Sequence, residues 1–471
     1  MISSSAALLE SLIEATLKAG ADAVDARISE SASLSVEVRN GDLETVEREE
    51  SRGIALRALV GRRQATVSAT DLSPDALKAL SERVVAMARL APEDKFCGIA
   101  EASEIAHHHP DLKLETDDLP EADELERRGR EMEAAAMAIP GVKQMSHCGA
   151  SWNTGQTWLA ASNGFRARKS SGMSSMAAVA IAERDGAMER DYESSSERRR
   201  DRHKTPEWIG REAGTRAVSR LGARKVDSQT AAVIYDHKLS SRLIGALIGA
   251  ISGPAVARGV SFLKDKLGKQ VFAPGVNLID DPLRETGFGS RAFDGEGRPV
   301  KRTALVEDGV LTQWLLNGPS ARQLGLAPNG FSSTAFGDPP GVTTSNLDLQ
   351  PGTRTLDQLM ADAGKGLLIT DMFGPSLNPN TGDYSVGVSG FWFENGERAY
   401  PVSEVTVAGD IPSMLLRAIP GSDLEIRGST NAPSLLIDGM SLAGRWRSCR
   451  RSRADRRGGA GGGTPCARMA G

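Results

Sequence analysis

The chain has 471 residues, enough for two or three domains at about 150 residues each. Its 40% apolar and 25% charged residues exclude disordered, collagen-like and fibrous proteins. Only 4% of the residues are aromatic, which argues against a stacking platform for single-stranded nucleic acid. Because no apolar run approaches the ~18 residues that cross a bilayer, we expect a globular protein with no membrane contact.

Positive charge is concentrated at the C-terminal end. Residues 445–471 carry eight arginines and one aspartate. Since this tail contributes +7 to a total charge of −4, residues 1–444 carry −11. An acidic body offers no basic face for phosphates, so nucleic acid is not an expected partner. Arginine and glycine dominate the tail without apolar periodicity, which predicts disorder; we hypothesise a frame-shifted or read-through extension.

Cysteine usage and the N-terminal residues indicate the compartment. The cysteines are Cys97, Cys148, Cys449 and Cys466. They form no CxxC motif and are too sparse for a disulfide framework, which indicates a reducing compartment. Residues 1–19 have no basic n-region and contain Glu10 and Glu14, so they do not read as a signal peptide. We therefore expect a cytoplasmic protein.

In chain order, the first half reads as helices alternating with groups of antiparallel strands. The expected elements are a helix at 5–19, strands at 34–39, 44–47, 53–60 and 64–69, a helix opening at Ser73, a loop at 93–120, a helix at 122–138, a strand meander over 142–184 and a helix at 206–221. Asn40-Gly41 after an alternating run is a strong hairpin signal. Pro74 after Ser73 is typical of a helix start.

The second half is richer in hairpins. The expected elements are a strand at 231–235, helices at 239–251 and 355–363, a hairpin of 303–307 with 310–316, and a hairpin of 391–394 with 398–402. Grouped strands with helices between the groups predict an α+β fold and not a doubly wound sheet. We place domains at 1–224 and 225–444, the second β-rich, followed by the tail.

Two motifs suggest ligand sites only weakly. The run His107-His108-His109 lacks the spacing by which zinc ligands converge, so a solvated loop is preferred over a metal site. Residues 287–292 fit GxGxxA, but the following 293–297 cannot open the helix that a dinucleotide-binding fingerprint requires.

The segment Tyr235 to Gly245 reads as a strand end that runs into an amphipathic helix. A metallopeptidase helix at this place would carry two histidines as ligands and a glutamate as general base. His237 is present, but Lys238 and Arg242 are cations that repel Zn²⁺. We therefore expect His237 to be a capping or core-edge histidine, with a ligand role as the alternative.

Long ordered motifs resemble the TldD/PmbA family, and its PmbA/TldE branch more closely than TldD. They lie at 22–94, 220–226, 261–268, 293–317, 320–326, 381–409 and 430–444, so the resemblance covers about residues 1–444. The resemblance implies a cytoplasmic two-chain zinc metallopeptidase that handles peptides and small unfolded proteins. In that family TldD carries HExxxH and a later cysteine, and PmbA/TldE lacks them.

Residues 237–242 fall where HExxxH would lie, and only the first histidine is kept. Lys238 takes the glutamate position and Arg242 the second histidine position. The resemblance thus implies a chain without zinc or catalytic residues, in a heterodimer with a TldD-like subunit that supplies both; alone, the chain would be a homodimer at most. The alternatives are a regulatory protein of the gyrase-modulator type and a stand-alone peptide-binding module. A paralogue with HExxxH in the same genome would favour the interpretation as a peptidase subunit.

We expect peptide contact between Thr381 and Pro401. The candidate residues are Thr381, Asp383, Tyr384, Ser385, Gly387, Ser389 and Gly390. Glycines inside a strand often mark the close approach of another backbone, as when a peptide adds a strand to a sheet. A glycine-rich strand packed in the core is an equal alternative.

Overall fold

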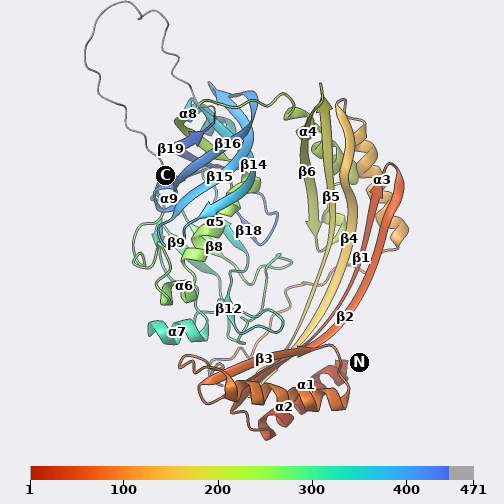
Figure 1. The fold of residues 1–471 in the computed structure, drawn as a ribbon, viewed down its shortest axis with the longest axis vertical. Helices are drawn as coiled ribbons and strands as arrows, with labels where there is room; N and C mark the ends of the chain where they lie inside the picture. Colours follow the sequence, from red (N-terminus) through yellow and green to blue (C-terminus); the bar gives the residue numbers. More distant parts are fainter. Residues whose placement is uncertain (1, 445–471) are drawn as a thin grey trace, which may run out of the picture.

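The computed structural model describes residues 2–444 and shows an α+β protein, as the sequence predicted. The first half forms an antiparallel sheet of order β3-β2-β1-β4-β5-β6 (Figure 1). Its strands are β1 (Ala23–Arg39), β2 (Asp42–Val60), β3 (Arg63–Ala69), β4 (Val142–Ala161), β5 (Arg166–Arg184) and β6 (Ala187–Glu197). The accompanying helices are α1 (Ile2–Lys18), α2 (Pro74–Leu90), α3 (Ala122–Met137) and α4 (Pro206–Ser219), with a 3-10 turn η1 (Arg200–Arg202).

The two faces of this first sheet differ. Even-numbered residues of β1, such as Val24, Ile28 and Val36, lie in the two cores that pack under the helices. Odd-numbered residues face the opposite side, where small hydroxyls meet across strands: Ser31 with Ser51 at 2.7 Å between the oxygens, for example. We call this second surface the polar face. The strict period of two along β1 is what separates the apolar and polar residues.

One expectation for this sheet was wrong in detail. We predicted separate strands at 44–47 and 53–60, but β2 is continuous from Asp42 to Val60. The intervening residues are charged and carry no apolar alternation. They extend because β1 pairs with them throughout, with Leu34 opposite Arg48. Pairing to a long neighbour overrides weak local propensity.

The second half holds a sheet of order β16-β15-β14-β7-β19-β17 and a smaller one of order β10-β9-β8-β13-β18. The strands of the larger sheet are β7 (Gln229–Tyr235), β14 (Lys365–Leu377), β15 (Asp383–Glu394), β16 (Glu397–Asp410), β17 (Ile419–Pro420) and β19 (Leu435–Ala443). The other strands are β8 (Leu278–Asp280), β9 (Thr303–Glu307), β10 (Val310–Leu311), β11 (Ser332–Ser333), β12 (Gly341–Val342), β13 (Leu347–Leu349) and β18 (Thr430–Asn431). The helices are α5 (His237–Ala250), α6 (Gly253–Ala257), α7 (Gly318–Leu324), α8 (Leu356–Ala363) and α9 (Ile411–Arg417).

The larger C-terminal sheet is buried on both faces. In β7, Val233 and Tyr235 belong to the main core with α5, whereas Ile234 belongs to a second core under α8. The hairpin at Asp308-Gly309 is present, but β10 ends at Leu311, short of the expected 316. The chain leaves the ladder because Leu315 donates its backbone N–H to Ile251.

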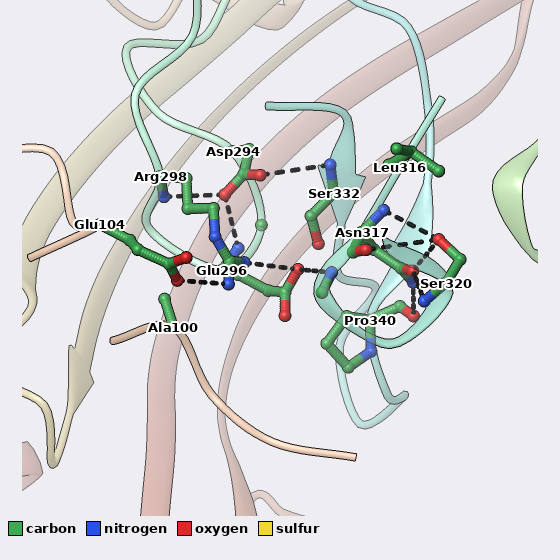
Figure 2. Close-up of polar contacts among 12 residues, drawn as sticks. Ala100, Glu104, Asp294, Glu296, Arg298, Leu316, Asn317, Ser320, Ser332 and Pro340 are labelled. Carbon is green, nitrogen blue, oxygen red and sulfur yellow. Dashed lines mark hydrogen bonds and ion pairs between the residues drawn. The ribbon is translucent and has the colours of Figure 1, made fainter. Parts of the chain in front are cut away.

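The predicted loop at 93–120 contains no helix or strand. It lies between α2 and α3 in the chain and contacts the second half of the protein. Figure 2 shows Glu104 of this loop beside the turn 294–298 of the second half. Glu104 pairs with Arg298 at 2.8 Å, and the backbone of Ala106 donates to Gly297. Within residues 2–444, no helix has the length and apolar character to cross a bilayer. The basic tail at 445–471 lies outside the described residues.

Candidate functional site

The site predicted from the metal motif lies at the start of α5, which follows the central strand β7. Asp236 caps the helix by accepting the backbone N–H of Lys238 at 3.0 Å. Ser240 is fully buried and donates its hydroxyl to the carbonyl of Ala432 at 3.0 Å. A side-chain cap and a buried anchor on the next turn fix the helix start rigidly. The side chains of residues 237, 238 and 242 are therefore held in defined positions.

His237 lies among carboxylates. Its Nε2 is 3.3 Å from Glu425, and its Nδ1 is 3.4 Å from Asp236 and 3.7 Å from Asp423. Burial works against protonation, but the hydrogen bond to Glu425 and the neighbouring carboxylates outweigh it, so the pKa of His237 is raised. The same hydrogen bond lowers the pKa of Glu425 to about 2, with a smaller effect of Arg427. His237 is the first residue of α5, next to the cap Asp236, and its partly buried ring lies at the edge of the core.

Lys238 joins α5 to the edge of the first sheet. Its ammonium pairs with Glu193 of β6, whose side chain is 1% exposed. Arg427 binds the other carboxylate oxygen of Glu193 at 2.5 Å. Burial opposes ionisation of Glu193, but the two cations lower its pKa. We call this cluster of Glu193, Lys238 and Arg427 the charged seam.

The residues at the metal-motif positions have partners within the protein. His237 is the only ligand type among them, and its ring nitrogens face carboxylates as partners. Lys238 is committed to Glu193, and Arg242 donates to the carbonyl of Met372 at 3.1 Å. Zinc prefers neutral imidazole, thiolate and carboxylate ligands that converge without competing cations. In residues 2–444 no group of three or more such side chains is arranged to hold a metal ion.

The predicted peptide segment lies inside the larger sheet. Strand β15 pairs with β14 on one side and with β16 on the other. A Cβ built on Gly390 would lie 1.9 Å from the carbonyl oxygen of Leu368, so the backbone that approaches this glycine is that of β14. At Gly387 the neighbour is the ring of Phe373. A peptide therefore cannot add a strand directly to β15, and the core-strand alternative accounts for both glycines.

The residues of that segment differ in accessibility. Thr381 and Asp383 are exposed in a turn, where their side chains hydrogen-bond at 2.6 Å. Ser385 and Gly387 are half-buried; Tyr384, Ser389 and Gly390 are buried. Any direct contact with a peptide would therefore use the turn at 381–385. That contact stays a prediction.

The two weak motifs have structural roles. The ring of His109 lies against Phe165 and Phe293, with centroids 5.8 and 4.9 Å away, while His107 and His108 are exposed. In the GxGxxA segment, a Cβ on Gly289 would lie 2.3 Å from the carbonyl of Ser345. The glycine thus permits two loops to approach.

Sequence reasoning assigned no separate role to the turn at 294–298, which Figure 2 shows in close-up. Asp294 accepts the backbone N–H groups of Glu296 at 2.9 Å and Arg298 at 2.8 Å. Burial, together with the charge of Glu296, raises the pKa of Asp294 to about 6. Glu296 accepts the first N–H of α7, from Gly318, at 2.7 Å. The turn thus connects the loop at 93–120 with α7.

The fold is that of a two-part α+β protein, with a helix start rich in charged side chains after the central strand of its second half. Three family models match: PmbA/TldA metallopeptidase domain 1 at 24–88, the central domain at 114–221 and the C-terminal domain at 228–444. Metalloprotease PmbA of Escherichia coli O157:H7 is 34% identical, covering 90% of this chain and 92% of that protein. The PmbA homologue of Haemophilus influenzae is 32% identical, with 92% and 94% covered. The chain belongs to the PmbA/TldD metallopeptidase family.

Solved structures of other proteins show the same fold. A Bacteroides thetaiotaomicron protein described as a candidate modulator of DNA gyrase has a TM-score of 0.85 and 26% identity, covering 93% of this chain and 98% of that one. TldE from Thermococcus kodakarensis shares the fold, with a TM-score of 0.82 at 17% identity and coverage of 93% and 100%. The family resemblance expected from the sequence is confirmed.

Proposed function

We propose that this chain is the non-catalytic, PmbA/TldE-like subunit of a cytoplasmic metallopeptidase complex. In this proposal, zinc and the hydrolytic chemistry come from a TldD-like partner, and the two chains act on peptides and small unfolded proteins. The observation that carries the proposal is the commitment of Lys238 and Arg242 to protein groups. A cation bound to Glu193 cannot replace a carboxylate that activates water.

Peptide contact in this chain is proposed at the turn 381–385, through exposed side chains. Thr381 and Asp383 offer a hydroxyl and a carboxylate there. Asp383→Asn should lower peptide turnover by the mixed complex while both chains still co-elute. Asp357→Asn, an exposed acid in the first turn of α8, is the matched control.

Metal content tests the first part of the proposal. Purified chain, analysed by inductively coupled plasma mass spectrometry, should contain well under one zinc per molecule, and a chelator should leave its melting temperature unchanged. Stoichiometric zinc that disappears in His237→Ala would overturn the assignment of a non-catalytic subunit.

Co-expression tests the second part. The chain and a TldD-like protein with an intact HExxxH should elute together by size exclusion, and peptide degradation should need both. Full degradation by the TldD-like protein alone, eluting separately, would contradict the proposal.

A further inference from the structure

The polar face of the first sheet carries a group of cations at the end nearest the second half. Arg27 of β1 and Lys169 of β5 point to this face, because Arg27 is in register with Leu159 of β4 and Lys169 with Thr157, two residues away. Residues two apart on a strand share a face. Arg291 belongs to the loop between β8 and β9. Both arginines donate to backbone carbonyls of the segment 330–335.

The charges of these three residues are not balanced by ion pairs. In the part of the chain that the structure describes, none of the three forms a salt bridge, and the ammonium of Lys169 makes no hydrogen bond. A group of like charges without counter-ions attracts an anion. The Nε of Arg291 is also buried without a partner among the described residues.

Nearby carboxylates have other partners. Asp25 is held by Arg57 at 2.5 Å. Asp280 accepts the N–H and hydroxyl of Ser345, and Asp294 is bound by backbone N–H groups of its turn. The exposed Asp338 remains, near Arg27. The cluster therefore has an excess of positive charge.

Lys169 is the solvent-accessible member of the cluster. Its side chain is accessible to solvent, yet burial is the main cause that lowers its pKa, followed by the charges of Arg27 and Arg291. Beyond Lys169, the polar face continues in small hydroxyls such as Ser29 and Thr157, whose oxygens are 3.3 Å apart. These groups can donate to or accept from a peptide backbone.

We propose that Lys169, Arg27 and Arg291 form a carboxylate-binding site at the end of the polar face. Its ligand would be the C-terminal or side-chain carboxylate of a peptide, and this choice of ligand rests on the proposed function. Lys169 supplies the mobile charge, since the two arginines are anchored to the 330–335 segment. The site would orient a peptide by its carboxylate and would not select for the rest of the peptide sequence.

Acetylation of lysines tests the site without any peptide. Full-length protein is treated with an acetylating reagent, and modification of Lys169 is followed by mass spectrometry with succinate or with succinamide at equal ionic strength. Succinate should slow acetylation of Lys169 about fivefold, as expected for a weak ion pair, and leave the exposed Lys78 unchanged. No protection by succinate, or protection by inorganic phosphate alone, would overturn the site as a carboxylate site.

Peptide binding tests the ligand. Fluorescence anisotropy compares a labelled hexapeptide with a free C-terminus, the same peptide amidated, and an amidated peptide with one internal glutamate. The free or glutamate-bearing form should bind about fivefold more tightly than the neutral one. Lys169→Gln should abolish this preference, Lys169→Arg should keep it, and Arg168→Gln should not affect it, because Arg168 points to the opposite face over Trp158.

The two assays separate the inferences. Peptide binding without a preference for carboxylates would overturn the site and leave the proposed function standing. Protection of Lys169 by succinate with no binding of any peptide would support the site and contradict the proposed peptide ligand.

Discussion

The two large sheets of this protein differ in how many of their faces are buried. The first has strands of up to 20 residues, packs one face under helices and leaves the other face polar. The second is buried on both faces, and its central strand β7 contributes to two cores. A sheet buried on both faces tolerates no change in side-chain volume, whereas a polar face can vary and bind ligands.

The largest difference between the two sheets should appear at their glycines. Gly390→Ala places a Cβ within 3.0 Å of three backbone atoms of β14, which cannot move without breaking the ladder. We expect a loss of more than about 4 kcal/mol in the free energy of unfolding, measured by urea denaturation, or no soluble protein.

Gly155→Ala on the polar face is the matched control. Its Cβ would meet the Ser171 hydroxyl at 3.1 Å, and that hydroxyl can rotate away. The free energy of unfolding should change by less than about 1 kcal/mol. Similar losses for both variants would remove the contrast between the sheets.

The charged seam between the sheets should be the next most sensitive place. Glu193→Gln leaves Lys238 and Arg427 without their shared carboxylate in a buried position. Breaking a buried pair typically costs about 3–5 kcal/mol, and we expect about 3 kcal/mol in urea denaturation. Glu44→Gln, in an exposed pair with Arg39 at the far hairpin, should cost less than about 1 kcal/mol. Equal losses of unfolding free energy in Glu193→Gln and Glu44→Gln would mean that the charged seam is solvated.

The pKa values of two histidines, one in each half, should be shifted in opposite directions from the ordinary value. His237 gains Glu425, so its folded pKa lies above its unfolded value near 6.5; this stabilisation is complete below that pH and is lost as the pH rises through the raised pKa. His203, between the hydroxyls of Ser174 and Ser195, has its pKa lowered to about 4 by burial. Its neutral ring favours folding above pH ~6.5, and that contribution falls as the pH drops toward 4.

Proton NMR of the ring C–H signals measures both histidines in one titration. His237 should titrate above 6.5 and His203 far below it. Glu425→Gln should lower the pKa of His237 and leave that of His203 unchanged. A His237 pKa below 6.5 in the unaltered protein would show that burial dominates over the carboxylates.

The smallest effects should come from single hydroxyls. Ser240→Ala removes a buried donor to the carbonyl of Ala432 and should cost about 1 kcal/mol of unfolding free energy. Ser175→Ala removes a hydroxyl that meets Ser196 on the polar face and should change stability by less than about 0.5 kcal/mol. Thermal unfolding of the two variants side by side resolves this difference, and a larger loss at Ser175 would contradict it.

The sequence by itself determined most of the local elements and the family of the chain. Apolar periodicity placed the helix at 206–221, and Asn-Gly pairs placed the turns at 40–41 and 395–396, because these signals depend on neighbours a few residues away. The family motifs, such as the one at 293–317, could likewise be read directly from the sequence.

Only the tertiary structure decided what those residues contact. Glu193 and Arg427 lie far from Lys238 along the chain and meet it because the edge of one sheet lies against the start of α5. Strand order also decided that β15 is internal, which no alternation of side chains could indicate. Local patterns fix the conformation of a segment, whereas its neighbours depend on how distant segments fold together.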